Sequence, residues 1–384
     1  MRFEFATAGR IIFGPGTVAE LGPLARAMGR RAFVVTGKDK MRHAGAIGEL
    51  EGAGLGCTLF GVAGEPAIAL VREGAALFQA SGCELLIAIG GGSVIDAGKA
   101  IAALAANPGD VLDYVEVIGK GQPLPNTPFP MLAVPTTAGT GSEVTRNAVL
   151  GSPQHGVKAS LRSPMMLPRV AIVDPQLTLG LPPAMTATTG LDALTQLIEP
   201  YVATKANPVT DAFCLDGLHA VKRSLERACE DGNDAGARAG MSYASLLGGL
   251  ALANAGLGVV HGFAAPLGGR FSAPHGAVCA AILPHGTEMN IRALRERHPE
   301  SGALSRYQEI ARLLTGDGEA SAEDGAAWVR TLVRKLHIPR LSEYGIGPEH
   351  VDDMAAKAAR ASSMKTNPVE LTTAELKWVM ERAI

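Results

Sequence analysis

The stretch that decides the fold is Leu85-Leu86-Ile87-Ala88-Ile89 followed by Gly90-Gly91-Gly92-Ser93-Val94-Ile95-Asp96. Its first five residues are all apolar and have the length of one buried strand, and residues 93–105 have the apolar spacing of a helix. Glycines let the backbone approach a pyrophosphate closely, while free N–H groups and the positive end of the helix dipole face its charge. The junction therefore predicts a phosphate cradle. The alternative is a plain turn in which Ser93 and Asp96 form a capping box.

Short apolar runs alternate with amphipathic stretches on both sides of this junction. The pattern predicts a helix at 67–81 and further strands at 32–36, 131–134 and 170–173. Such alternation is typical of a mostly parallel sheet with crossover helices. We therefore expect an α/β dinucleotide-binding domain over residues 1–180.

The second half of the chain has a different composition. From Pro182 onward it is rich in Ala, Leu and Gly with helical periodicity, in the segments 186–201, 211–230 and 236–253. Prolines and a glycine between residues 174 and 183 mark the boundary. We expect an all-helical domain over residues 181–384 that carries a metal and the substrate.

Composition excludes several function classes. The 384 residues are 47% hydrophobic, and 35 basic side chains nearly cancel 37 acidic ones, so a nucleic-acid partner is not expected. No basic leader precedes an apolar run, and no apolar run approaches the length of a membrane span. Five cysteines are scattered without CxxC pairing. We therefore expect a cytoplasmic protein with neither a membrane nor a nucleic-acid partner.

Two further segments are candidates for cofactor binding. The loop from Pro135 to Glu143 follows a predicted strand, and its hydroxyls and glycines suit ribose, phosphate or the nicotinamide amide. Gly37-Lys38 follows another strand, where an acidic residue would bind the ribose 2′-hydroxyl of NAD. Glycine and lysine instead leave room and positive charge for the 2′-phosphate of NADP. The cofactor is expected to be NADP or NAD, with NADP favoured.

A candidate metal site is distributed over the second half. Asp192 and Gln196 are spaced i, i+4 on an apolar helix, where a carboxylate must be paired, capped or metal-bound. Downstream, His261 and His275 each precede a glycine. Two imidazoles and a carboxylate would make an Fe(II) or Zn(II) site with an open position. Taken singly, each residue has another explanation: a hydrogen-bonded histidine or a carboxylate that caps a neighbouring helix.

The two histidines need a change of chain direction between them to converge. Pro266, Gly268 and Gly269 lie in this interval. We expect them to form the bend.

Together these segments resemble the iron-containing (group III) alcohol dehydrogenase family over nearly the whole chain. The matching stretches are Phe13-Gly14-Pro15-Gly16, Gly90 to Lys99, Pro135 to Glu143, Gly190 to Thr195, His261-Gly262 and Pro274-His275-Gly276. The resemblance implies a dinucleotide-binding α/β domain, a helical domain, an active site in the cleft between them, and homodimers. It implies metal ligation by Asp192, His261 and His275. It implies cofactor contacts from Gly91, Gly92, Ser93, Asp96, Thr136, Thr137 and Thr140.

Two positions depart from the family pattern. Gln196 stands where the family usually has a histidine as fourth ligand, and its carbonyl oxygen is a weaker donor for a transition metal. Ala265 stands where many members have a second histidine implicated in proton transfer. The expected catalytic and metal-ligating set is therefore Asp192, Gln196, His261 and His275, with the metal acting as a Lewis acid on an alcohol or aldehyde oxygen during hydride transfer.

Two other functions compete with this prediction. The metal-independent maleylacetate reductases are similar around Val157-Lys158 and residues 161–164, and such an enzyme would act on an anionic oxoacid. Its substrate would need a cation, for which the candidates are Arg146, Arg162, Arg270 and Lys365. The scaffold is also shared with dehydroquinate synthase-like lyases, and a chain that lacks two family histidines could be a catalytically silent dinucleotide-binding protein.

Overall fold

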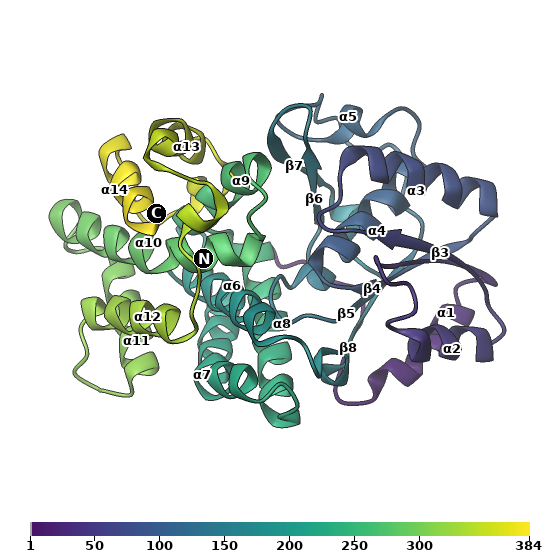
Figure 1. Cartoon of the computed structure of the whole chain (residues 1–384), viewed down its shortest axis with the longest axis horizontal. Helices are drawn as coiled ribbons and strands as arrows, with labels where there is room; N and C mark the ends of the chain where they lie inside the picture. The colour runs from purple at the N-terminus through teal and green to yellow at the C-terminus, as the bar shows by residue number, and fades with distance from the viewer. Residues whose placement is uncertain (1) are drawn as a thin grey trace. The chain divides into compact units, whose positions relative to one another are not determined.

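The computed structural model of the chain describes residues 2–384, which form two compact units. The α/β unit comprises Ala6–Thr137 and Gly141–Leu179. The helical unit comprises Gly180–Ile384 together with the N-terminal residues up to Phe5 and the segment Ala138–Thr140 (Figure 1). The functional roles assigned above to residues 1–180 and 181–384 remain predictions.

A six-stranded sheet of order β1-β8-β5-β4-β2-β3 forms the centre of the α/β unit, and all of its pairings are parallel. Its strands are β1 (Ile11–Phe13), β2 (Arg31–Gly37), β3 (Gly56–Val62), β4 (Leu85–Gly90), β5 (Met131–Pro135) and β8 (Val170–Val173). The predicted α/β class with a mostly parallel sheet is confirmed. Every residue of β4 is buried, as expected for a central strand covered on both faces.

Helices cover both faces of this sheet. Figure 1 shows α1 (Leu21–Arg26) and α2 (Ala44–Gly52) on one face, and α3 (Ile68–Ser81) and α4 (Gly92–Ala106) on the other. Because side chains alternate along a strand, β2 contributes to two cores: Phe33 and Val35 pack on the α3–α4 side, and Val34 on the α1–α2 side.

Several elements of the α/β unit were not predicted from the sequence, among them two strands and a hairpin. The strand β1 has only three residues, and β3 is a half-exposed edge strand that contains two glycines. An antiparallel hairpin joins β6 (Asn147–Ser152) to β7 (Val157–Arg162) outside the main sheet. Its inward residues include Ala148 and Ala159, whose small side chains weaken the apolar alternation that identifies a strand.

The helical unit is built around α6, which is buried from Gly190 to Val202 and contacts α7, α8 and α10. The helices are α6 (Pro183–Val202), α7 (Pro208–Glu230), α8 (Ala235–Ala255), α9 (Val259–Arg270), α10 (His275–Arg297), α11 (Gly302–Thr315), α12 (Ala322–Lys335), α13 (Val351–Ala359) and α14 (Thr373–Ala383). Within residues 2–384 no single helix is long and apolar enough to cross a membrane; α8 and α9 pass that test only as a pair bent by 98°.

The expected bend at Pro266, Gly268 and Gly269 is wrong. The helix α9 continues through all three residues to Arg270, and the chain changes direction over residues 271–274. An internal proline costs a helix about 3 kcal/mol. That cost is offset here because Phe263 and most of its neighbours on α9 are buried, and α9 packs against α10 and α13. Tertiary packing therefore overrides the local preference.

Candidate active site

The strand-to-helix junction after β4 has the geometry of a phosphate cradle. The helix α4 begins at Gly92, and its N-cap Gly91 is extended (φ −73°, ψ −177°) and makes no side-chain capping bond. Ser93 and Asp96 do not form the alternative capping box, because the Asp96 carboxylate accepts hydrogen bonds from Ser142 Oγ (2.5 Å) and Val149 N (2.9 Å). The N–H groups at the start of α4 are therefore not capped by a side chain within residues 2–384.

Packing requires glycine at the first position of the cradle. A Cβ added at Gly90 would lie 2.6 Å from the Cβ of Val94, closer than side-chain carbons approach. A Cβ at Gly91 would lie 3.2 Å from Thr137 Oγ1, which is tight but tolerable. Gly91 therefore keeps the mouth of the cradle open, whereas Gly90 allows the helix to pack on its strand.

Strand register brings the other predicted cofactor segments to the same edge of the sheet. Gly90 pairs with Pro135, so Thr136 and Thr137 follow the neighbouring strand β5 at the level of the cradle. On the other side Thr36 pairs with Ile89, which places Gly37 and Lys38 at the end of β2. The carboxyl edge of a doubly wound sheet, where the strand order reverses, is where such folds bind nucleotides.

The surroundings of Gly37 suit a bulky ribose substituent. A Cβ at Gly37 would meet nothing within 4 Å, and Lys38 is exposed. The nearby Asp39 carboxylate accepts a hydrogen bond from Met41 N at 3.0 Å, within its own loop. Thr140, another predicted cofactor contact, belongs to the segment Ala138–Thr140 that groups with the helical unit.

Asp96 and Lys99, both on α4, make hydrogen bonds to β6 of the hairpin. Lys99 is buried, and its ammonium donates to Thr145 Oγ1 (2.9 Å) and Asn147 O (2.6 Å) and pairs with Asp96 at 3.4 Å. Burial lowers the pKa of Lys99, and Asp96 opposes that shift. Asp96 thus holds the segment from Ser142 to Val149 against α4, and its predicted cofactor contact stays a prediction.

A second buried ionisable side chain, Glu143, lies near Lys99. Glu143 ends the Thr/Gly loop and is 2% exposed. Burial raises the pKa of its carboxyl to about 7, although its own backbone N–H and Lys99 favour the ionised form.

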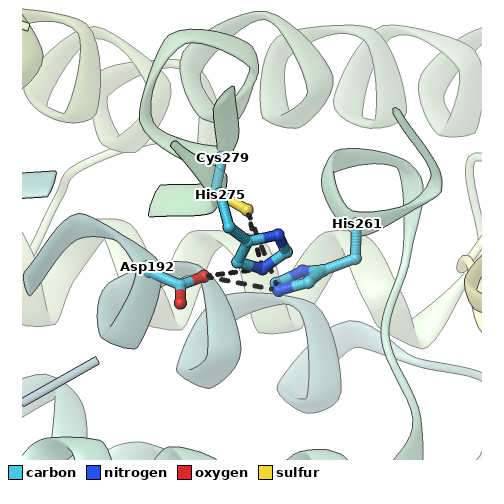
Figure 2. Close-up of side chains that lie close together, drawn as sticks. All are labelled: Asp192, His261, His275 and Cys279. Carbon is cyan, nitrogen blue, oxygen red and sulfur yellow. Dashed lines mark hydrogen bonds and ion pairs between the residues drawn. The ribbon is translucent and has the colours of Figure 1, made fainter. Parts of the chain in front are cut away.

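Three predicted metal ligands converge in the helical unit (Figure 2). Asp192 comes from α6, His261 from α9 and His275 from the first position of α10. Asp192 Oδ1 lies 3.4 Å from His261 Nε2 and 3.8 Å from His275 Nε2. Segments 14 to 83 residues apart in sequence are thus brought to one point by the packing of α6, α9 and α10, and we assign a metal-ligand role to these three side chains as a proposal.

Cys279 joins this cluster and was missed from the sequence. Its Sγ lies 3.6 Å from His275 Nε2 and 3.9 Å from His261 Nε2, and the four donor atoms all lie within 4.8 Å of one another. No CxxC pair marks this cysteine in the sequence; the informative spacing is i, i+4 from His275 on one helix.

Glu199 orients His261 and was also missed. Its Oε2 accepts a hydrogen bond from His261 Nδ1 at 2.7 Å, and its Oε1 accepts one from Val260 N at 2.7 Å. A proton held on Nδ1 leaves the lone pair of His261 on Nε2, the atom that faces Asp192. The signal in the sequence is a second carboxylate two helical turns after Asp192 on an apolar helix.

The buried oxygens of the cluster are suited to a cation. Within the described chain, Asp192 Oδ1 and Gln196 Oε1 are buried and have no hydrogen-bond partner. Burial alone would raise the pKa of Asp192, but His275 and His261 hold it below its usual value. A carboxylate oxygen, two imidazole nitrogens and a thiol sulfur around one point are a donor set for a divalent transition metal. The residues therefore fit the metal that the sequence predicts.

Comparison with known proteins agrees with this geometry. Residues 8–175 match the family model of iron-containing alcohol dehydrogenase, and residues 186–384 match that of the C-terminal part of the Fe-containing alcohol dehydrogenase family. The chain belongs to the iron-containing alcohol dehydrogenase family. This alcohol dehydrogenase is therefore an oxidoreductase that acts on CH–OH groups and interconverts alcohols and aldehydes.

Relatives of the dehydrogenase match along its full length. The 1,3-propanediol dehydrogenase of Klebsiella pneumoniae is 36% identical over 99% of this chain and 98% of its own. The NAD-dependent methanol dehydrogenase of Bacillus methanolicus is 34% identical over 97% of both chains. A solved structure of a 1,3-propanediol oxidoreductase is similar with a TM-score of 0.91, at 34% identity and complete coverage of both chains. The predicted cofactors, a nicotinamide dinucleotide and a divalent metal, are thus those of the family.

Proposed function

We propose that this dehydrogenase reduces small uncharged aldehydes to primary alcohols, and catalyses the reverse oxidation, with a divalent metal held by Asp192, His261 and His275. The observation that carries the proposal is the convergence of these three side chains around a buried carboxylate oxygen that lacks a hydrogen-bond partner within residues 2–384. A bound reduced nicotinamide would supply the hydride for the carbonyl carbon, and water would supply the proton that completes the alcohol.

The bound metal supplies Lewis-acid polarisation of the carbonyl group. The protein's side chains hold the donors in place: Glu199 fixes the tautomer of His261, and Gln196 Nε2 donates to Asp192 Oδ2 at 3.0 Å. Ala265, one turn after His261 on α9, has no ionisable group. Without an imidazole at position 265, the proton would be exchanged with water, directly or through a hydroxyl of the bound cofactor.

The edge formed by Gly37, Lys38, Gly91–Ser93 and Thr136–Thr137 is proposed to bind the dinucleotide. The free space at Gly37 and the exposed cation at Lys38 favour NADP over NAD. The α/β domain would thus hold the cofactor and the helical domain the metal and substrate. We further propose that the enzyme acts in the cytoplasm as a homodimer.

A metal-dependence assay tests the proposal. The purified enzyme is analysed for metals and assayed for NADPH and NADH consumption with propanal, butanal and a short oxoacid, before and after chelation. We expect about one metal per chain, aldehyde reduction that chelation abolishes and Zn(II) or Fe(II) restores, and loss of activity in His261→Ala. His298→Ala, an exposed histidine on the same unit, is the matched control and should behave as wild type.

Two outcomes would contradict it. Chelator-insensitive reduction of the oxoacid would indicate a metal-independent reductase. Two of the cations that could bind such an oxoacid already form ion pairs: Arg162 with Glu116 at 3.6 Å and Arg270 with Asp353 at 2.5 Å. These pairs count against a metal-independent reductase. Tight dinucleotide binding without turnover of any substrate would indicate a silent binding protein.

A further inference from the structure

The position of the Gln196 side chain decides which residue completes the metal site. Its amide nitrogen, which has no lone pair, faces Asp192 Oδ2 at 3.0 Å. Rotating the amide by half a turn would bring two oxygens into that contact, which is repulsive while Asp192 is ionised. Gln196 is therefore oriented as a hydrogen-bond donor to Asp192.

Cys279 supplies the fourth donor atom of the cluster. In a tetrahedral zinc site, bonds of about 2.0–2.3 Å place nitrogen and oxygen donors about 3.4 Å apart and nitrogen and sulfur donors about 3.6 Å apart. The oxygen–nitrogen separations here are 3.4 and 3.8 Å, and the sulfur–nitrogen separations are 3.9 and 3.6 Å. These four separations are thus within a few tenths of an ångström of those that one shared metal imposes, and the other two pairs of donor atoms lie within 4.8 Å.

Hydrogen bonding at Asp192 is consistent with the same set. Gln196 occupies Oδ2, so Oδ1, which lies nearest the two imidazoles, is the oxygen available for a metal. Cys279 is fully buried on α10 and lies one turn after His275. Its sulfur faces both imidazoles (Figure 2).

We propose that Cys279 is the fourth protein ligand of the metal, that Gln196 is a positioning residue for Asp192, and that the resulting site prefers zinc to iron. The inference rests on the metal-dependent function proposed above and specifies its metal. A thiolate in the donor set favours Zn(II) over Fe(II), which also follows the general affinity order of these ions. Zinc accepts a fifth ligand as well, so four protein donors do not close the site to a substrate.

X-ray absorption of the zinc-loaded wild-type enzyme tests the sulfur ligand without any substitution. We expect one sulfur scatterer at about 2.3 Å beside nitrogen and oxygen scatterers at about 2.0–2.1 Å. Cys279→Ser should lose the sulfur scatterer, whereas Cys57→Ser, a half-buried cysteine on β3, should retain it. Gln196→Ala should retain the sulfur but weaken zinc binding about 10–100-fold.

Competition between metals tests the preference. Apoenzyme dialysed anaerobically against equimolar Zn(II) and Fe(II) should recover zinc, and Cys279→Ser should lower the zinc-to-iron ratio about tenfold or more. A stoichiometric metal bound by nitrogen and oxygen alone, in an enzyme that reduces aldehydes, would overturn the sulfur ligand and leave the proposed function intact. A folded enzyme that reduces aldehydes without binding any metal would overturn both.

Discussion

Replacing Glu199 by glutamine should weaken metal binding by shifting a proton within His261. The carboxylate accepts two hydrogen bonds at 2.7 Å, from His261 Nδ1 and from Val260 N. An amide offers one oxygen and one NH₂ group. Because the backbone N–H of Val260 can only donate, it takes the oxygen, and the NH₂ group is left facing Nδ1. The histidine then satisfies this donor by accepting at Nδ1, which moves its proton to Nε2, the atom needed for the metal.

The magnitude follows from the loss of this orienting contact. Removing such a partner typically costs 10–100-fold in metal affinity, or about 1.4–2.8 kcal/mol. Because both polar groups keep a hydrogen-bond partner, the free energy of unfolding of the apoenzyme should fall by only about 1 kcal/mol. Glu199→Gln thus separates metal affinity from stability.

Competition with a chromophoric chelator measures the zinc dissociation constant of Glu199→Gln, and urea unfolding of the apoenzyme measures its stability. Glu309→Gln is the matched control, since that carboxylate accepts a hydrogen bond from Tyr201 and an amide oxygen can do the same. A folded Glu199→Gln enzyme that binds zinc within about twofold of wild type would refute the assignment of the tautomer to Glu199.

Three further predictions concern the α/β unit. Gly91→Ala should raise the dinucleotide dissociation constant about tenfold with little change in melting temperature. Gly90→Ala, whose Cβ would overlap Val94, should instead destabilise the fold by about 1–3 kcal/mol. Equal effects of both substitutions in binding and melting experiments would contradict the distinct roles of the two glycines. Gly37→Asp should shift the kcat/KM ratio about tenfold from NADPH toward NADH, because an acidic side chain binds a ribose hydroxyl and repels a phosphate; an unchanged ratio would show that the 2′ position lies elsewhere. Burial raises the pKa of Glu143 to about 7, above the 4.5 that is usual for a glutamate, so its contribution to stability is fully present below pH 4.5 and is lost as the pH rises toward 7. Glu143→Gln should therefore be more stable than wild type at pH 8, by up to about 3 kcal/mol, and equally stable at pH 4. Urea unfolding at both pH values measures this difference. A difference between the two urea midpoints that does not change with pH would rule out a buried carboxyl with a raised pKa.

Local patterns were sufficient for the longer buried elements of the α/β unit. The predicted helix at 67–81 is α3, and the predicted strands at 85–89 and 131–134 are β4 and β5, because long apolar periodicity reports burial directly. The hairpin was missed because its inward face relies on alanines, and the bend at Pro266 was wrong because the packing of α9 offsets the cost of an internal proline.

The proposed metal site also contains residues that the sequence identifies and residues that it does not. Asp192, His261 and His275 were recognisable because each residue type is unusual in its apolar or glycine-rich surroundings and because the order of motifs resembles a family. Cys279 and Glu199 were not recognisable by that route. A cysteine or a glutamate within a helix is common, and its role depends on which other helix it faces.

By itself, the sequence determined the class of fold, the strand-to-helix cradle and the three proposed ligands, because strand and helix periodicity and the glycine run are properties of neighbouring residues. Only the tertiary structure decided that the side chain of Gln196 donates to Asp192, that Glu199 sets the tautomer of His261, and that the sulfur of Cys279 faces both imidazoles. These relations join helices that are far apart along the chain. Their distances and hydrogen-bond directions depend on how α6, α9 and α10 pack, which no local pattern specifies.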